Sequence, residues 1–217
     1  MAKVAPTYPR DDTTTSIGSS LPEDELPPAQ LANAAAKGDL PAAQALVELV
    51  SPALTRAVFS IMGPDRAEAD DVVQQALIAF VQALPAFRGD SHPTTYATRI
   101  AVRTALASRK RQRSQQTKLE AFAELSEIRR SAPTEPSDEL QAATRRALVR
   151  HLLDELPAEQ AEALALHIVV GLSLKDVATA TDAPLNTVKS RMRLAKQALR
   201  RRIEDDPTVA EELGVEP

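Results

Sequence analysis

The sequence predicts an all-α fold made of two small helical domains joined by a flexible linker. Aromatic residues are only 3% of the 217 residues, and no stretch sustains the alternation of aromatic and β-branched residues that strands favour. Apolar residues instead recur at helical spacing in two blocks. The periodicity is lost between the blocks, where Pro133 and Pro136 lie. The expected division is a disordered acidic and proline-rich tail (1–28), a first domain (29–113), a linker (114–138), a second domain (139–203) and an acidic tail (204–217).

The first domain is predicted to begin with two helices. An alanine-rich helix ends before Gly38, because glycine commonly ends a helix. Asp39 is suited to cap the second helix, which ends near Gly63. The apolar residues of this second helix follow one stripe: Leu46, Leu49, Val50, Leu54 and Val58.

The third helix, which begins near Pro64, shows the clearest periodicity. Its expected buried stripe consists of Val73, Leu77, Phe80, Val81 and Leu84. Its opposite, exposed face consists of Asp71, Gln74, Gln75, Ile78 and Gln82. A fourth helix is expected over residues 94–111. It would bury Ala97, Ile100, Ala101 and Thr104, and present Arg99, Arg103 and Lys110 on another side.

The second domain is predicted to contain a helix-turn-helix. Pro157 opens a helix that Gly171 closes, and Ser173 caps a short helix that follows. Asp182 stands in the turn, where a left-handed backbone is needed and aspartate is tolerated. Pro184 opens the last helix, whose first turns would enter a major groove. Its inward stripe is Val188, Met192, Ala195 and Leu199.

Charge is strongly segregated along the chain. Residues 91–119 and 183–203 each carry seven Lys or Arg and no acid, so together they hold 14 of the 26 basic residues. The rest of the chain has 12 bases against 30 acids, or −18. Two basic helices in an otherwise acidic chain predict two separate contacts with a polyanion.

Several other classes of protein are not expected. The chain has no cysteine, which excludes disulfides and cysteine-ligated zinc, and no run of 18 apolar residues that would predict a membrane span. The pair Asp70 and Asp71 lacks the further ligands that a metal or acid–base site needs, and the three histidines are scattered. We therefore expect a non-enzymatic, cytoplasmic protein with no cofactor and no metal.

Certain motifs resemble a known family. The first domain contains Ala69–Leu77 (ADDVVQQAL), Phe87–Asp90 (FRGD) and Thr95–Ala101 (TYATRIA). The second contains Leu156–Gln160 (LPAEQ), Gly171–Ser173 (GLS) and Thr187–Arg191 (TVKSR). In this order, they resemble the extracytoplasmic-function (ECF) sigma factors of the sigma-70 family, over roughly residues 31–203.

The resemblance implies an RNA polymerase sigma factor, which directs core polymerase to specific promoters and helps to melt them. It also implies three contact sets and an anti-sigma partner. The set that binds the β′ clamp helices is Asp70, Asp71, Gln74, Gln75 and Ile78. The set that reads and opens the −10 element is Tyr96, Arg99, Arg103, Arg109, Lys110 and Arg111. The set that reads the −35 element, from a domain that packs on the β flap, is Asn186, Thr187, Lys189, Ser190, Arg191, Arg193 and Lys196.

Two departures from the family pattern concern the −10 element. Tyr96 stands where the family usually has Trp, although Tyr also stacks on unpaired bases. Arg103 stands where the family often has Asn, which changes the favoured base or makes this position a phosphate contact.

Alternatives remain open from the sequence. An autonomous helix-turn-helix regulator would explain the second domain but leaves residues 70–113 without a role, and a metal-dependent nuclease lacks a ligand set. A further hypothesis is that the acidic ends, Glu23–Glu25 and Glu204–Glu216, fold over the basic helices and suppress DNA binding. Solubilising tails are an equally good reading of these ends.

Overall fold

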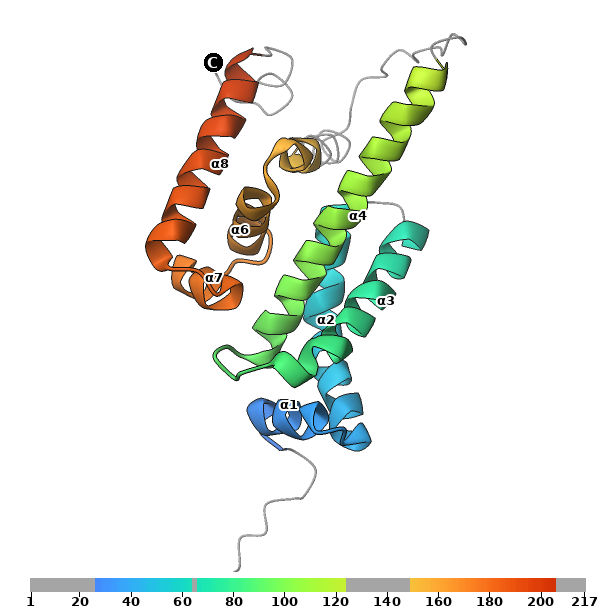
Figure 1. The fold of residues 1–217 in the computed structure, drawn as a ribbon, viewed down its shortest axis with the longest axis vertical. Helices are drawn as coiled ribbons and strands as arrows, with labels where there is room; N and C mark the ends of the chain where they lie inside the picture. The colour runs from blue at the N-terminus through green and yellow to red at the C-terminus, as the bar shows by residue number, and fades with distance from the viewer. Residues whose placement is uncertain (1–25, 64–65, 124–148, 206–217) are drawn as a thin grey trace, which may run out of the picture.

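The computed structural model describes residues 26–63, 66–123 and 149–205, and within these ranges the regular structure is helical, with no strand (Figure 1). Residues 149–155 are helical. The other elements are α1 (Pro28–Ala36), α2 (Leu40–Met62), α3 (Arg66–Ala83), the 3₁₀ turn η1 (Leu84–Ala86), α4 (Pro93–Ala123), α6 (Ala158–Ile168), α7 (Leu174–Thr181) and α8 (Leu185–Asp205). The predicted all-α class is confirmed.

Helix α2 is the centre of the first group of helices and contacts α1, α3 and α4. Asp39 caps it as predicted, its carboxylate accepting a hydrogen bond from the amide of Ala42 at 3.0 Å. Gly63 ends it with a φ of 97°. A Cβ at Gly63 would lie 3.1 Å from Arg150 Nε, so glycine there serves both the turn and the approach of an arginine from the second group.

Among the described residues, α2 is also the one helix long and apolar enough to cross a membrane, with a mean hydropathy of 1.5. Its packing is that of a core helix. Five of its side chains are completely buried in contacts within the bundle: Leu46, Val50, Leu54, Val58 and Ile61.

The predicted buried stripe of α3 is displaced by one position. The residues buried on α3 are Ala69, Val72, Ala76 and Phe80, followed by Leu84 in η1. Of the predicted stripe, Phe80 and Leu84 are thus buried, Val73 and Leu77 are half-buried, and Val81 is exposed. The physical reason is size, because alanine at two positions of the stripe lets α3 approach its neighbours closely.

Helix α4 is longer than the sequence indicated. It continues to Ala123, so residues 114–123 are helical rather than part of a linker. These residues have no apolar period, but they include no glycine or proline and consist largely of good helix formers. Ala97 and Ala101 are buried as predicted, while Ile100 and Thr104 are half-buried. Residues 124–138 of the expected linker, and the expected start of the second domain at 139, lie outside the described residues, as do residues 1–25.

Residues 149–205 form the second group, in which α8 contacts α6 and α7. Ser173 caps α7, accepting a hydrogen bond from the amide of Asp176. Asp182 has a φ of 50° and a ψ of 43°, the left-handed conformation predicted for the turn. Val177 and Val188 are fully buried, one on each helix of the motif. The predicted inward stripe of α8 is confirmed, with Leu199 half-buried and its other three members buried.

The left-handed turn gives a stability prediction. Replacing Asp182 with valine should lower the free energy of unfolding by about 1–2 kcal/mol, because a β-branched residue tolerates this backbone conformation poorly. Asp182→Gly should not lower it, although both variants lose an exposed ion pair with Arg88. Urea unfolding measures the difference, and an equal loss in both variants would assign the effect to the ion pair instead.

Candidate nucleic-acid interface

The first candidate surface is one side of α3, which we call the α3 polar face and define as Asp71, Gln74, Gln75 and Ile78. The spacing of three and four residues places all four side chains on one side of the helix, and all four are exposed. Ile78 is 58% exposed, an unusual position for a large apolar residue amid polar ones. Asp70 is also exposed beside them. The predicted exposed face is therefore confirmed as a surface.

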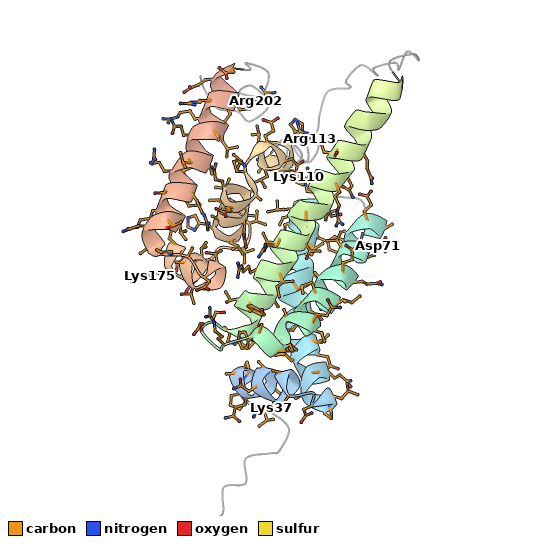
Figure 2. The ribbon with its side chains drawn as sticks, viewed as in Figure 1. Lys37, Asp71, Lys110, Arg113, Lys175 and Arg202 are labelled. Atoms are coloured by element: carbon orange, nitrogen blue, oxygen red, sulfur yellow. The ribbon has the colours of Figure 1, made fainter. Side chains whose placement is uncertain are left out.

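This face is separated from α8 by helix α4. Helix α4 contacts α3 as well as α6 and α7, and it lies between α3 and α8 in the ribbon (Figure 1). Asp71 lies on α3 at the side of the molecule away from α8 (Figure 2). A partner bound to the α3 polar face would leave α8 accessible.

The basic residues of α4 fall into two classes. Arg103, Lys110 and Arg111 are exposed and line a groove along α4 together with Thr104 and Ala107. Lys110 and Arg111 are available to a polyanion in this conformation, and so is Arg103, whose side chain is 62% exposed although its Nε lies 4.0 Å from Glu162 Oε1.

Arg99 and Arg109 are instead held by carboxylates of the second group. Arg99 Nε donates to Glu162 Oε1 at 3.0 Å. Arg109 makes a two-pronged contact with Asp154, at 2.9 Å from Nε and 2.5 Å from Nη2. The carboxylates are nearly buried, with side chains 12% exposed for Glu162 and 6% for Asp154.

Tyr96 lies in the first turn of α4 and is half-buried. Its ring packs on Phe87, with centroids 5.0 Å apart, and on Phe80 at 6.3 Å. Its hydroxyl donates to the carbonyl oxygen of Ala83 at 3.3 Å. The ring is thus positioned by the loop and helix before it, with part of its surface still accessible.

The third candidate surface is the start of α8. Asn186, Lys189, Ser190 and Arg193 are exposed on its first turns, as predicted, and so is Lys196. Thr187 is half-buried. These exposed side chains combine donors suited to guanine, adenine and phosphate, so α8 has the chemistry of a helix that reads base edges.

Arg191 differs from the other predicted residues of α8. Its side chain is only 20% exposed, and Nη2 donates to Glu159 Oε2 on α6 at 2.6 Å. In this conformation it ties α8 to α6. Arg202 likewise approaches Glu155, which also pairs with Arg113 of α4.

Sequence reasoning missed the four carboxylates that meet the basic helices: Asp154, Glu155, Glu159 and Glu162. Their one signal in the sequence is that they cluster in a short acidic stretch between the two basic ones. The described residues contain no group of three His, Cys, Asp or Glu that would hold a metal ion.

Two protein-family models match this chain, and each match includes candidate surfaces described above. Residues 46–115 match the family model Sigma-70 region 2, and residues 146–199 match Sigma-70, region 4. The first match includes the α3 polar face and the basic side of α4, and the second includes the helix-turn-helix.

Two relatives are each about one third identical to this chain over the aligned residues. The RNA polymerase sigma-H factor of Pseudomonas aeruginosa is 34% identical over 145 residues, which are 62% of this chain and 72% of the relative. The ECF RNA polymerase sigma-E factor of Escherichia coli K12 is 33% identical over 144 residues, which are 62% of this chain and 73% of the relative.

A solved structure has a similar fold. That of CnrH in complex with the cytosolic domain of CnrY matches with a TM-score of 0.51 and 25% identity, over 82% of this chain and 98% of that one. Two ordered sigma-70 regions and relatives that align over most of their length leave one conclusion: the chain belongs to the ECF group of the sigma-70 family of RNA polymerase sigma factors.

Proposed function

We propose that this sigma factor binds core polymerase through the α3 polar face and contacts promoter DNA through α4 and α8. The observation that carries the first part is Ile78, exposed within a row of amide and carboxylate groups. An apolar side chain ringed by polar ones is the anatomy of a protein-binding hot spot. The proposed partner of Asp70, Asp71, Gln74, Gln75 and Ile78 is the pair of clamp helices of the β′ subunit.

The proposed role of α4 is to contact the −10 element and hold its opened strand. Arg103, Lys110 and Arg111 are exposed for phosphate or base contacts, and Arg99 and Arg109 join them when their carboxylate partners are released. Unstacking costs about 1.4 kcal/mol per base step, and stacking on an aromatic side chain returns roughly 1–3 kcal/mol per base. With Tyr96 as the aromatic member of the set proposed for the −10 element, the sigma factor captures only one or two bases and relies on polymerase for the rest of melting.

The proposed role of α8 is to read the −35 element in the major groove. Asn186, Lys189, Ser190 and Arg193 face outward from its first turns, the part of a recognition helix that meets base edges. Thr187, Arg191 and Lys196 flank this set. The body of the domain would pack on the β flap.

Two further parts of the proposal concern where the sigma factor acts and what inhibits it. A sigma factor of this kind acts with polymerase in the cytoplasm and catalyses no reaction itself. An anti-sigma factor is the expected inhibitor, and the similar fold of CnrH was solved with a domain of another protein bound. An autonomous regulator, the alternative from the sequence, has no need of the α3 polar face.

Run-off transcription tests the proposal. Core polymerase and this chain together should give specific transcripts from templates selected by sequencing the DNA that the assembled holoenzyme retains. Either component alone should give none. Tight, sequence-specific DNA binding by the free chain with no effect on core polymerase would favour the autonomous regulator instead.

A further inference from the structure

The contact between α4 and residues 149–168 joins the two sigma regions through the arginines proposed for DNA. Arg99, Arg103, Arg109 and Arg113 lie within roughly a third of the circumference of α4, at 3.6 residues per turn. Each approaches a carboxylate of the second group. The pairs are Arg99 with Glu162, Arg103 with Glu162 at 4.0 Å, Arg109 with Asp154, and Arg113 with Glu155 at 3.5 Å.

We infer that this contact is an autoinhibitory latch: in the free protein the carboxylates of Asp154 and Glu162 occupy the guanidinium groups that promoter DNA uses. The inference rests on the proposed role of α4 in DNA binding. A carboxylate and a phosphate both bind a guanidinium through paired oxygens. The second domain and the DNA strand therefore compete for the same side of α4.

The burial of these pairs makes the competition effective. Arg109 and Asp154 are 16% and 6% exposed and share two hydrogen bonds, unlike the exposed pairs that contribute little. To bind Arg99 or Arg109 as the carboxylate does, a DNA phosphate has to displace a carboxylate that already accepts hydrogen bonds from the guanidinium. Domain separation is then a condition for complete contact with the −10 element.

The rest of the interface favours reversible opening. A partly open pocket of about 250 Å³ lies at it, lined by apolar residues such as Leu106, Leu153 and Leu156 together with charged residues such as Arg103, Asp154 and Glu162. Side chains that line this pocket lack protein contacts on that side, so this part of the interface is less closely packed than a domain core. Separation also hydrates the released charges, which repays part of the lost pairing.

The same acidic stretch reaches the other basic helix. Glu155 pairs with Arg113 of α4 and lies 3.5 Å from Arg202 of α8, and Arg88 before α4 bonds to Asp182 in the turn of the helix-turn-helix at 2.8 Å. The two DNA-binding helices are thus held in one arrangement by charges within the chain. The sequence raised the acidic ends as a candidate for this task, and Glu23–Glu25 and residues 206–216 lie outside the described residues. Within the described residues, the carboxylates that contact α4 come from residues 154–162.

The test uses the full chain with two reporters. Because the sequence has no cysteine, Asn33→Cys and Gln197→Cys, both at exposed positions on α1 and α8, accept a pair of fluorescent dyes for energy transfer. The second reporter is binding of a short fluorescein-labelled poly(dT) strand to the unlabelled chain, without polymerase. The variant is Asp154→Asn with Glu162→Gln. The control, Glu48→Gln with Asp205→Asn, removes the same charge at exposed positions.

The latch predicts lower energy transfer in the Asp154/Glu162 variant than in the parent chain. It also predicts that the variant binds poly(dT) more tightly by roughly tenfold, because a tenfold excess of the closed state would reduce the apparent affinity of the parent chain by about that factor. The control should change neither. Added salt should lower energy transfer in the dye-labelled parent chain, because the latch is ionic. Circular dichroism shows whether the variant is folded. The salt measurement does not depend on the variant, so it tests the latch even if the variant folds poorly.

Unchanged energy transfer, in the variant or in salt, would overturn the latch, as would open domains without tighter binding. Tighter binding without opening would assign the effect to charge alone and also overturn it. Neither reporter requires core polymerase. A chain that opens but does not bind polymerase would contradict the proposed function and leave the latch standing, so the two failures are distinguishable.

Discussion

Replacing Ile78 with aspartate is expected to weaken binding to core RNA polymerase by roughly 30- to 1000-fold while the fold stays intact. Ile78 is 58% exposed on the α3 polar face, so the substitution opens no cavity and should change stability by less than about 0.5 kcal/mol. In a complex, the same side chain would be desolvated among amide and carboxylate groups. A charge there should cost the 2–4 kcal/mol typical of a disrupted hot spot.

The measurement is a titration of the labelled sigma factor with core polymerase, followed by fluorescence anisotropy. Leu40→Asp is the matched control, since Leu40 is 80% exposed and lies in the first turn of α2 rather than on α3. It should bind as the unmodified chain does. Equal affinity of the Ile78→Asp variant would remove the α3 polar face as the docking surface.

Local features of the fold could be predicted well from the sequence. The caps at Asp39 and Ser173, the helix end at Gly63 and the left-handed turn at Asp182 are all present. Each depends on one residue and its immediate backbone, because a side chain that satisfies a free amide or tolerates positive φ acts within a few positions. Such features need no knowledge of the rest of the structure.

The buried side of α3 shows where a periodicity argument loses accuracy. Large apolar residues mark a helix face, and on that basis Val73 and Leu77 were the centre of the predicted stripe. The buried side is centred on Ala69, Val72 and Ala76. Two alanines let the helices come close, and the larger residues then fill the flanks of the contact. A small residue carries little hydrophobic signal, so tertiary packing decides its burial.

The pairing of basic helices with acids could not be predicted at all. Asp154 is 45 residues from Arg109, and Glu162 is 63 residues from Arg99. The sequence showed that both basic helices exist and that a short acidic stretch lies between them. Which carboxylate meets which arginine follows from how the two groups of helices dock, and no local pattern encodes that geometry.

Replacing Lys189 and Arg193 together with alanine is expected to remove most discrimination for the −35 element. The two residues are four apart, so they share one side of α8, and both are exposed on its first turns. A side chain that reads a base edge contributes about 1–3 kcal/mol of discrimination. Loss of both should reduce the preference for promoter over scrambled −35 duplex by at least about thirtyfold, measured with holoenzyme by competition binding.

The control separates base reading from general attraction. Lys196→Ala with Arg201→Ala removes the same charge from exposed positions further along α8. It should weaken promoter and scrambled duplex alike, and make the slope of log affinity against log salt shallower by about 0.9 for each lost phosphate contact. If the Lys189/Arg193 variant behaved in this way too, both residues would be phosphate contacts. Specificity would then have to come from the uncharged members of the set, Asn186, Thr187 and Ser190, because Arg191, the remaining cation of the first turns, is engaged with Glu159 on α6.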